Sequence, residues 1–523
     1  MDGISRGHAG QILASLRQPP VVSGPEGSRI TVNETVGKFS FLYERIRNAV
    51  DYKDEHLHRK AAIERILKRQ LILESEPGVI ADRLVRELIA ARYLPNGILP
   101  ESIIDDVARA VRKFLAVSRI KAGSDRHANW LLGIIAVEIE EILVDASGEK
   151  ALVTFLYERL ADRIRLRGAE LEDTERRLQV YVAGYRSLVK ADDDMLGFKL
   201  LRAYLPEWLR SEEWIENPRP IAERLVAVHF RIRGRLNHVL AQRFLRAVKP
   251  SAVSLSVLQD VLHEAGDGAS ALLENAQTLK ARLTAKVEQR YAQAKAKLRR
   301  GTVRAMIYLF ITKMLVALLL EVPIELLWYQ HVGILALMIN LLFPPLVMLF
   351  VGLLIRVPGQ ENTDRLNNGV MELLSDDPIP LREIKVPAIR RGMTGLLFGV
   401  AYATTFLISF GLVGMLLKTL NFTWISSAIF IFFLCVVSFF GFRLRLGARE
   451  VVVVESKQSL FSVLIDFLSL PILRAGRWLS RSISRLNVFL FVFDFLFEAP
   501  FKIFLTVLEE WFAFMKEKRE ELH

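Results

Sequence analysis

The 523-residue chain contains a single cysteine, Cys435, and none of the short motifs that most often accompany catalysis. One cysteine excludes an intramolecular disulfide and a cysteine-based zinc site. The sequence has no P-loop, GxGxxG, GxSxG or HExxH pattern, so the usual signatures of nucleotide, hydrolase and zinc-protease sites are missing. We therefore expect no cofactor and no metal, and a role other than catalysis is favoured.

Acidic residues are also scarce where basic residues are densest. The formal net charge is +12, and the stretch from Arg290 to Arg304 carries six basic residues and no acid. A second stretch, from Arg443 to Arg485, has eight basic residues against three acidic ones. Both stretches adjoin long apolar runs. They therefore predict contact with a lipid bilayer that has anionic headgroups, and no nucleic-acid partner is expected.

Four apolar runs are long enough to cross a membrane, since a spanning helix needs about 20 apolar residues. They cover about 305–328, 333–354, 395–417 and 422–442. Basic residues precede the first and third runs and follow the fourth, whereas the connections on the other side hold only Lys418. With no cleavable signal visible, this pattern predicts a multi-pass protein of the plasma (inner) membrane with cytoplasmic N- and C-termini.

Outside these runs the sequence lacks β-alternation and hairpin signals, so we expect an all-α membrane protein. Apolar residues recur every three or four positions from Leu272 to Leu298, which favours one rigid stalk helix that packs on its own domain or self-associates. The predicted parts are a disordered Gly-, Pro- and Ser-rich tail (1–34), two cytoplasmic helical subdomains (35–146 and 149–266), the amphipathic stalk helix (268–304), a four-helix transmembrane bundle (305–442, with a cytoplasmic loop at about 356–392) and a basic, Phe-rich membrane-surface region (443–523).

The two cytoplasmic subdomains share short strings at nearly constant offsets. FLYER occurs at 41–45 and 155–159, Glu-Arg-x-Leu at 64–67 and 175–178, and Tyr-Leu-Pro at 93–95 and 204–206, with offsets of 114, 111 and 111. Three collinear anchors predict a duplication. The alternative is shared helix chemistry, because apolar and charged residues alternate in similar ways on any amphipathic helix.

Four arginines mark the start of the C-terminal region. Arg474, Arg477, Arg481 and Arg485 follow one another at spacings of 3, 4 and 4, which places them on one stripe of a helix. If the C-terminal apolar segments crossed the bilayer, these arginines would lie outside. We therefore expect amphipathic helices that lie on the inner face or re-enter it, with the arginines on the headgroups. The alternative is a solvated face of a helix packed on the soluble domain.

Polar residues inside the spans are the strongest candidates for function, because a charge at a helix centre costs roughly 2.5 to 3.5 kcal/mol on insertion scales. They are Lys313, Glu321, Glu325 and Asn340. We expect Lys313 to extend its ammonium group to the inner interface, and the two glutamates to lie in an outer interfacial belt. Transport would require these side chains to face a water-filled cavity between the spans.

Two further span features concern packing. Pro344-Pro345 interrupts the second span in the way that transporters use, although such kinks also occur without transport. Gly395 and Gly399 form a GxxxG pair, which predicts close helix packing either within the chain or between two copies.

The cytoplasmic candidates are weaker. Glu55, His56 and His58 resemble a ligand set, but side chains two positions apart diverge around a helix, so a solvated helix start is the better interpretation. The run Asp192 to Asp194 lacks the spacing of a calcium loop and is expected to cap a helix.

These features predict a membrane-anchored binding or scaffolding protein that positions an unknown cytoplasmic protein partner at the bilayer, with a homo-oligomer as a further assembly. A channel or transporter gated through the stalk helix is the main alternative. An enzyme that acts on a lipid at the inner interface is the weakest.

Overall fold

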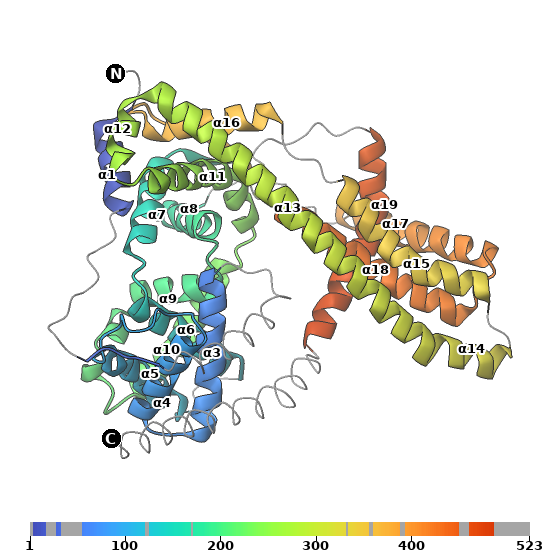
Figure 1. The fold of residues 1–523 in the computed structure, drawn as a ribbon, viewed down its shortest axis with the longest axis horizontal. Helices are drawn as coiled ribbons and strands as arrows, with labels where there is room; N and C mark the ends of the chain where they lie inside the picture. Colours follow the sequence, from blue (N-terminus) through green and yellow to red (C-terminus); the bar gives the residue numbers. More distant parts are fainter. Residues whose placement is uncertain are drawn as a thin grey trace, which may run out of the picture. The chain divides into compact units, whose positions relative to one another are not determined.

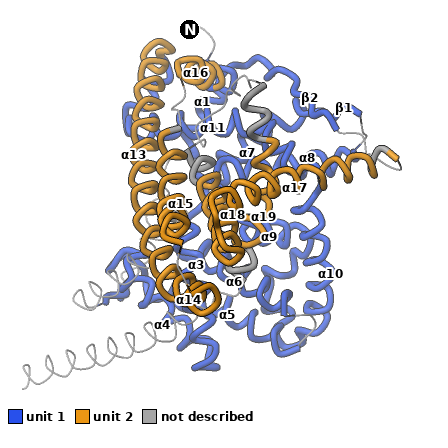
Figure 2. The backbone as a smooth tube through the Cα atoms, turned by 90° about the vertical axis from the view of Figure 1, so that its right-hand side faces the viewer, with its two compact units in different colours: residues 1–274, 370–386, 492–523 blue, residues 275–369, 387–491 orange. Residues whose placement is uncertain are grey.

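A computed structural model describes residues 4–16, 28–32, 55–120, 125–168, 171–330, 333–354, 359–386, 393–448 and 460–485 (Figure 1). The described chain is almost entirely helical and contains four helices that are long and apolar enough to cross a membrane. They coincide with the four predicted spans. The all-α membrane class is therefore confirmed. The chain divides into two compact units (Figure 2).

The first unit comprises the described parts of Met1–Glu274 together with Val370–Val386. Its helices are α1 (Arg6–Leu16), α3 (Glu55–Leu73), α4 (Pro77–Ala90), α5 (Ile103–Ser118), α6 (Asp125–Leu143), α7 (Ser147–Leu160), α8 (Asp173–Leu188), α9 (Asp193–Tyr204), α10 (Arg219–Leu236), α11 (Ala241–Ala265) and α12 (Ala269–Glu274), with short 3₁₀ turns at Pro206–Leu209, Ser211–Glu213 and Gly266–Gly268.

One contiguous apolar core joins the two predicted subdomains. Ile63 and Leu84 from the first half and Leu200 and Leu225 from the second half are all fully or almost fully buried in the same cluster. A shared core means that the halves are stabilised together rather than as separate domains. The duplication itself stays a prediction, and the first FLYER copy lies outside the described residues.

The prediction of a disordered tail is wrong for residues 6–16. They form helix α1, in which Ile12 is completely buried, and α1 packs against α7. The Ser5 amide also donates to the Leu374 carbonyl at 2.7 Å. The Gly, Pro and Ser content of residues 1–34 suggested disorder, but an apolar residue every third or fourth position within α1 is enough to dock a short helix.

The segment between the second and third spans is built into the first unit. Strands β1 (Ile164–Arg167) and β2 (Arg382–Lys385) pair in parallel. The sequence does not predict this pair, because each strand has only four residues. Arg159 donates to the carbonyls of Glu372, Ser375 and Asp377 at 2.8 to 3.0 Å. Residues 370–386 therefore lie on the same side of the membrane as the N-terminal half.

The second unit comprises the described parts of Asn275–Gly369 and Pro387–Phe491. Its elements are α13 (Ala276–Val316), a π-helix (Ala317–Glu321), α14 (Val322–Tyr329), α15 (Ile334–Leu354), most of α16 (Gln360–Leu374), α17 (Met393–Thr419), α18 (Trp424–Ala448) and α19 (Leu460–Arg485).

The stalk differs from the predicted single helix at both ends. At its start, the Asn275 side chain accepts a hydrogen bond from the Thr278 amide at 3.0 Å, so a new helix begins at Ala276 and separates Leu272 from the rest. At its other end no boundary exists, because α13 continues as one helix from the stalk into the first span. Its 41 residues give a rod about 60 Å long.

Three of the spans pack closely together, namely α13, α15 and α18, around a small apolar cluster that contains Met348 and Val437. Small residues permit this approach: a Cβ atom on Gly352 would lie 2.7 Å from the Thr302 side chain. Helix α17 instead packs mainly against α19, and a Cβ atom on Gly399 would contact nothing within 4 Å. The predicted four-helix bundle is thus a three-helix core with α17 at its side, and Gly399 is not used for packing within the described chain.

We predict that Arg159→Ala lowers the free energy of unfolding by at least about 1.5 kcal/mol, because three carbonyls lose a charged donor. Thermal or denaturant unfolding of the purified protein measures this change. The control is Arg167→Ala, which removes only an exposed ion pair to Glu383 and should cost no more than about 0.5 kcal/mol. Equal losses in the two variants would contradict the anchoring role of Arg159.

Candidate functional site

The predicted intramembrane polar residues converge on one buried cluster in the second unit. Lys313 lies near the end of α13, Glu321 ends the π-helix, Glu325 lies in α14 and Asn340 lies in α15. All four side chains are at most 1% exposed, with Ser426 of α18 equally buried. We call Lys313, Glu321, Glu325, Asn340, Thr423 and Ser426 the polar cluster.

Lys313 does not extend to the inner interface as predicted. Its Nζ lies 3.3 Å from Glu321 Oε2 and 4.7 Å from the centroid of the Phe433 ring. The ammonium group thus has a carboxylate and an aromatic face as partners inside the protein. A close carboxylate and an aromatic face attract a buried ammonium strongly in a low-dielectric site and offset part of its lost hydration. The snorkelling expectation is therefore wrong.

Glu321 accepts hydrogen bonds from two neighbouring helices in addition to the lysine. Asn340 Nδ2 of α15 lies 2.5 Å from Glu321 Oε1, and Ser426 Oγ of α18 lies 2.6 Å from the same oxygen. One carboxylate thus joins three spans. The prediction that Glu321 lies in an interfacial belt is also wrong, because the side chain is fully buried among these donors.

Asn340 keeps one atom unpaired within the described chain. Its Nδ2 also lies 3.1 Å from Ser426 Oγ and 3.3 Å from the Ser426 carbonyl, which fixes the orientation of the amide. Its Oδ1 is buried and has no hydrogen-bond partner among the described residues. A buried acceptor without a donor costs about 1–3 kcal/mol, so this oxygen marks a place where a donor is missing.

Glu325 is the outermost member of the polar cluster. Thr423 Oγ1 donates to its Oε1 at 2.8 Å, and the described residues offer it no cation. One turn further on, the rings of Trp328 and Trp424 lie 5.7 Å apart and both are largely exposed. Exposed aromatic rings thus lie at this end of the helices, whereas Glu325 is buried, so the prediction that it is exposed among them is wrong.

The π-helix has a local cause in Pro323. Proline has no amide hydrogen, and its ring clashes with the carbonyl four residues earlier. The wider turn at Ala317–Glu321 precedes this proline and removes the strain of a regular α-turn. Single π-turns often occur at functional sites because they redirect one side chain. Here the turn ends at Glu321, the carboxylate that joins the three spans.

Thr423, Ser426 and Phe433 were not singled out in the sequence. The available signal was the pair of hydroxyl residues three positions apart at the start of the fourth span, since such side chains bond across helices in membranes. Phe433 carries no comparable signal, because a phenylalanine in a span is ordinary.

The predicted membrane-surface arginines lie in α19, which packs against α17 and α18. Arg474 Nη1 donates to the Tyr402 hydroxyl at 2.6 Å and its guanidinium lies 5.1 Å from the centre of that ring. Arg477 is exposed. The side chains of Arg481 and Arg485, and the second C-terminal segment, lie outside the described residues. A headgroup role for the four arginines stays a prediction.

The weaker cytoplasmic candidates lie mainly at helix starts. Glu55 and His56 begin α3, and among the described residues no group of three potential metal ligands occurs. Asp192 caps α9, as predicted, by accepting from the Met195 amide at 2.9 Å. The Asp192 carboxylate also lies 2.6 Å from Lys60 Nζ and forms an ion pair with it. The two residues are 132 positions apart, so the sequence around Asp192 does not predict this contact.

A histidine pair in the first unit was not predicted. Nδ1 of His127 lies 3.0 Å from Nδ1 of His229, and the Trp130 ring stacks on His229 at 4.2 Å. Burial lowers the pKa of both imidazoles, that of His229 to about 4 with further help from the charges of His127 and Arg233. Both rings are therefore neutral near pH 7 and share one N–H between the facing nitrogens.

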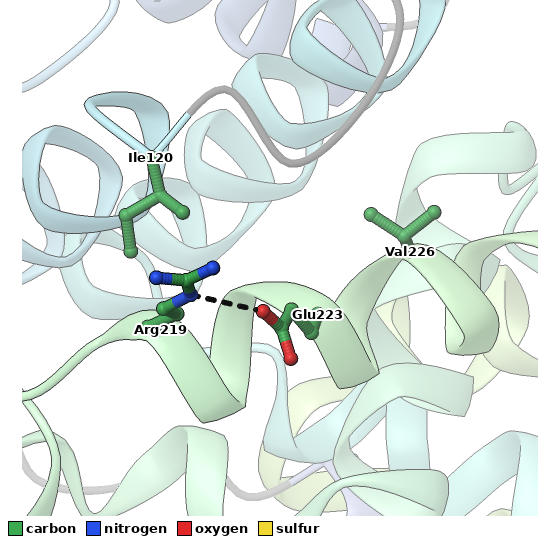
Figure 3. Close-up of a pocket in the computed structure, with 4 residues that line it drawn as sticks. All are labelled: Ile120, Arg219, Glu223 and Val226. Carbon is green, nitrogen blue, oxygen red and sulfur yellow. Dashed lines mark hydrogen bonds and ion pairs between the residues drawn. The ribbon is translucent and has the colours of Figure 1, made fainter.

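A surface hollow of about 630 Å³ lies between α10 and the end of α5 (Figure 3). Ile120 and Val226 provide apolar walls, and Arg219 and Glu223 form an ion pair at 3.1 Å beside them. Both charged side chains are mostly exposed, at 77% and 62%. An exposed ion pair of this kind contributes little free energy, and the hollow supports no specific function.

We predict a large coupling between Lys313 and Glu321. Lys313→Met alone should lower the free energy of unfolding by about 3–5 kcal/mol because it leaves a buried carboxylate unpaired, whereas Lys313→Met combined with Glu321→Gln should restore most of that loss. Unfolding in detergent micelles measures both. The control is Thr312→Val, which removes a hydroxyl bonded only to its own helix. Additive losses would contradict the pairing.

We predict that the first unit loses stability as pH falls from about 6.5 to about 4. In that range unfolded chains protonate their histidines while folded His229 stays neutral, so protons favour the unfolded state. His229→Phe should flatten this part of the pH profile of unfolding, and the exposed His263→Gln should not. An unchanged profile in His229→Phe would contradict the neutral pair.

Comparison with known proteins gives no match: no family model, no curated protein and no solved structure is similar to this chain. The function is therefore inferred from the geometry of the chain itself.

Proposed function

We propose that the chain is a membrane-anchored binding protein whose N-terminal helical unit holds a cytoplasmic protein partner close to an anionic bilayer. The observation that carries this proposal is the incorporation of residues 370–386 into that unit. Within the part of the chain that the structure describes, the backbone leaves the first unit after Glu274, returns at Val370 and leaves again after Val386. A binding unit joined to the membrane segments at several points is tethered more closely than one joined by a single linker.

Hydrogen bonds from side chains to backbone carbonyls support the incorporation. Arg382 donates to the Ala247 carbonyl at 2.6 Å and to Ser251 Oγ at 2.8 Å, while Arg159 binds three carbonyls of the same segment. Bonds from a charged donor to backbone are worth about 1.5–3 kcal/mol each, so the segment is a permanent part of the unit rather than a loose loop.

Exposed cations on α13 support the anionic bilayer as a second partner. They directly precede the apolar part of the helix and are Lys295, Lys297, Arg299, Arg300 and Arg304. Each basic residue near an anionic surface contributes about 1 kcal/mol of attraction. The same charges favour a cytoplasmic location of the first unit in the plasma membrane, by the positive-inside rule.

Transport remains the second candidate, and the unpaired Asn340 Oδ1 is the observation that favours it. Against it, Lys313 and Glu321 neutralise each other, and Glu321 already accepts from two further donors. A closed pair of this kind fixes how three helices pack, which suits an anchor.

The binding proposal is tested with a photo-crosslinking residue placed singly at Phe230 or Val239, which are 67% and 91% exposed in the first unit. We expect both positions to capture the same discrete protein in native membranes, and that protein to leave the membrane fraction in cells that lack the chain. Leu327, 78% exposed in α14, is the matched control and should not capture it.

Two results would contradict the proposal. One is a captured protein whose membrane association does not depend on this chain. The other is ion or solute flux through purified protein in anionic liposomes that disappears with Lys313→Leu or Glu321→Gln, which would favour transport.

A further inference from the structure

The charges of the polar cluster do not balance. Lys313 contributes one positive charge, and Glu321 and Glu325 contribute two negative charges when both are ionised. The lysine pairs with Glu321, at 3.3 Å. Glu325 is 1% exposed and its only described polar partner is a neutral hydroxyl, that of Thr423. A buried, uncompensated carboxylate is costly enough that it takes up a proton or a cation instead.

Among the described residues of its own helix, α15 and α18, no other group supplies Glu325 with a countercharge, and Lys418 at the end of α17 is exposed. On its own helix the titratable neighbours are Glu321 and Tyr329, one turn to either side. Helix α15 has no titratable side chain. In α18 the titratable residues are the buried Cys435 and, at the far end, Arg443 and Arg445.

The cluster is polar toward one membrane face and apolar toward the other. Glu325 lies four residues before the end of α14 at Tyr329, about 6 Å of helix rise. Thr423 directly precedes α18 and Ser426 lies in its first turn. Toward the opposite face, the described core next to Lys313 and Phe433 is apolar and contains Ala305, Leu309, Met348 and Val437. The polar side chains therefore lie nearer the face at which α14 ends, which favours proton exchange with that face.

The unpaired oxygen of Asn340 independently indicates a missing donor in this place. Its Oδ1 is fully buried, in the same side chain whose Nδ2 contacts Glu321 and Ser426. A hydronium ion or water that enters the cluster brings the O–H donor that this acceptor lacks.

We propose that Glu325 is an intramembrane proton-binding carboxyl that exchanges protons with the membrane face at which α14 ends. A hydronium ion gives its proton to one carboxylate oxygen of Glu325. An O–H bond forms, one water is released, and the charge of the cluster changes from −1 to zero. The ion pair of Lys313 and Glu321 stays intact. This proposal does not depend on the binding function proposed above.

The test is labelling by dicyclohexylcarbodiimide, which reacts with protonated carboxyls in apolar surroundings, followed by mass spectrometry of the peptides. Full-length protein is reconstituted in phosphatidylcholine–phosphatidylglycerol vesicles of known orientation. We expect an adduct on Glu325 and none on Glu321. The adduct should decrease about tenfold per unit of pH above its midpoint, as for one proton, and only when pH is raised on the side of the α14–α15 connection.

Two variants keep the test decisive. Glu325→Gln, which keeps an acceptor for Thr423, should lose the adduct completely, and Glu325→Asp should retain it if Glu325→Gln does not fold. Lys313→Met should create a new adduct on Glu321, because that carboxylate then lacks its countercharge. Absence of the Glu325 adduct at every pH, equal sensitivity to pH on both sides, or protection by sodium or potassium ions at constant pH would overturn the proposal.

Discussion

A charge inside a membrane protein is costly unless it is paired or neutralised, and the pairing of Glu321 links three spans of this chain. Lys313 and Glu321 lie eight positions apart in one continuous helical segment, and the π-helix before Pro323 turns the glutamate toward the lysine. Glu321 then needs further donors, which Asn340 and Ser426 supply from two other helices. One carboxylate therefore links α13, α15 and α18, in addition to the apolar cluster and the close contact at Gly352 that also join them.

The sequence was sufficient for features that depend on local composition. The four spans, the all-α class and the cap at Asp192 follow from apolar length, periodicity and the hydrogen bonding of one side chain to the next turn. The sequence also singled out the four intramembrane polar residues. A polar residue within an apolar run can be recognised without knowing its contacts, because inserting such a side chain into lipid costs free energy.

Local composition and periodicity did not predict features that depend on contacts between residues far apart in the sequence. Lysine near the end of a span can snorkel or pair, and the choice depends on Glu321 being turned inward by a π-helix that periodicity does not show. The docking of α1, the pairing of β1 with β2 and the contact of Lys60 with Asp192 join residues far apart in sequence. Short elements of this kind are stabilised by tertiary contacts rather than by local propensity.

The return of residues 370–386 to the first unit gives the most direct test of the whole account, because it requires that segment and the N-terminal half to share one side of the membrane. Single cysteines at Glu216, Asp376 and Gln330, in a Cys435→Ser background, are exposed to an impermeant maleimide in intact cells. The account predicts labelling of Gln330→Cys from outside, and labelling of Glu216→Cys and Asp376→Cys only after permeabilisation. Labelling of either of these two in intact cells, or of Gln330→Cys only after permeabilisation, would contradict it.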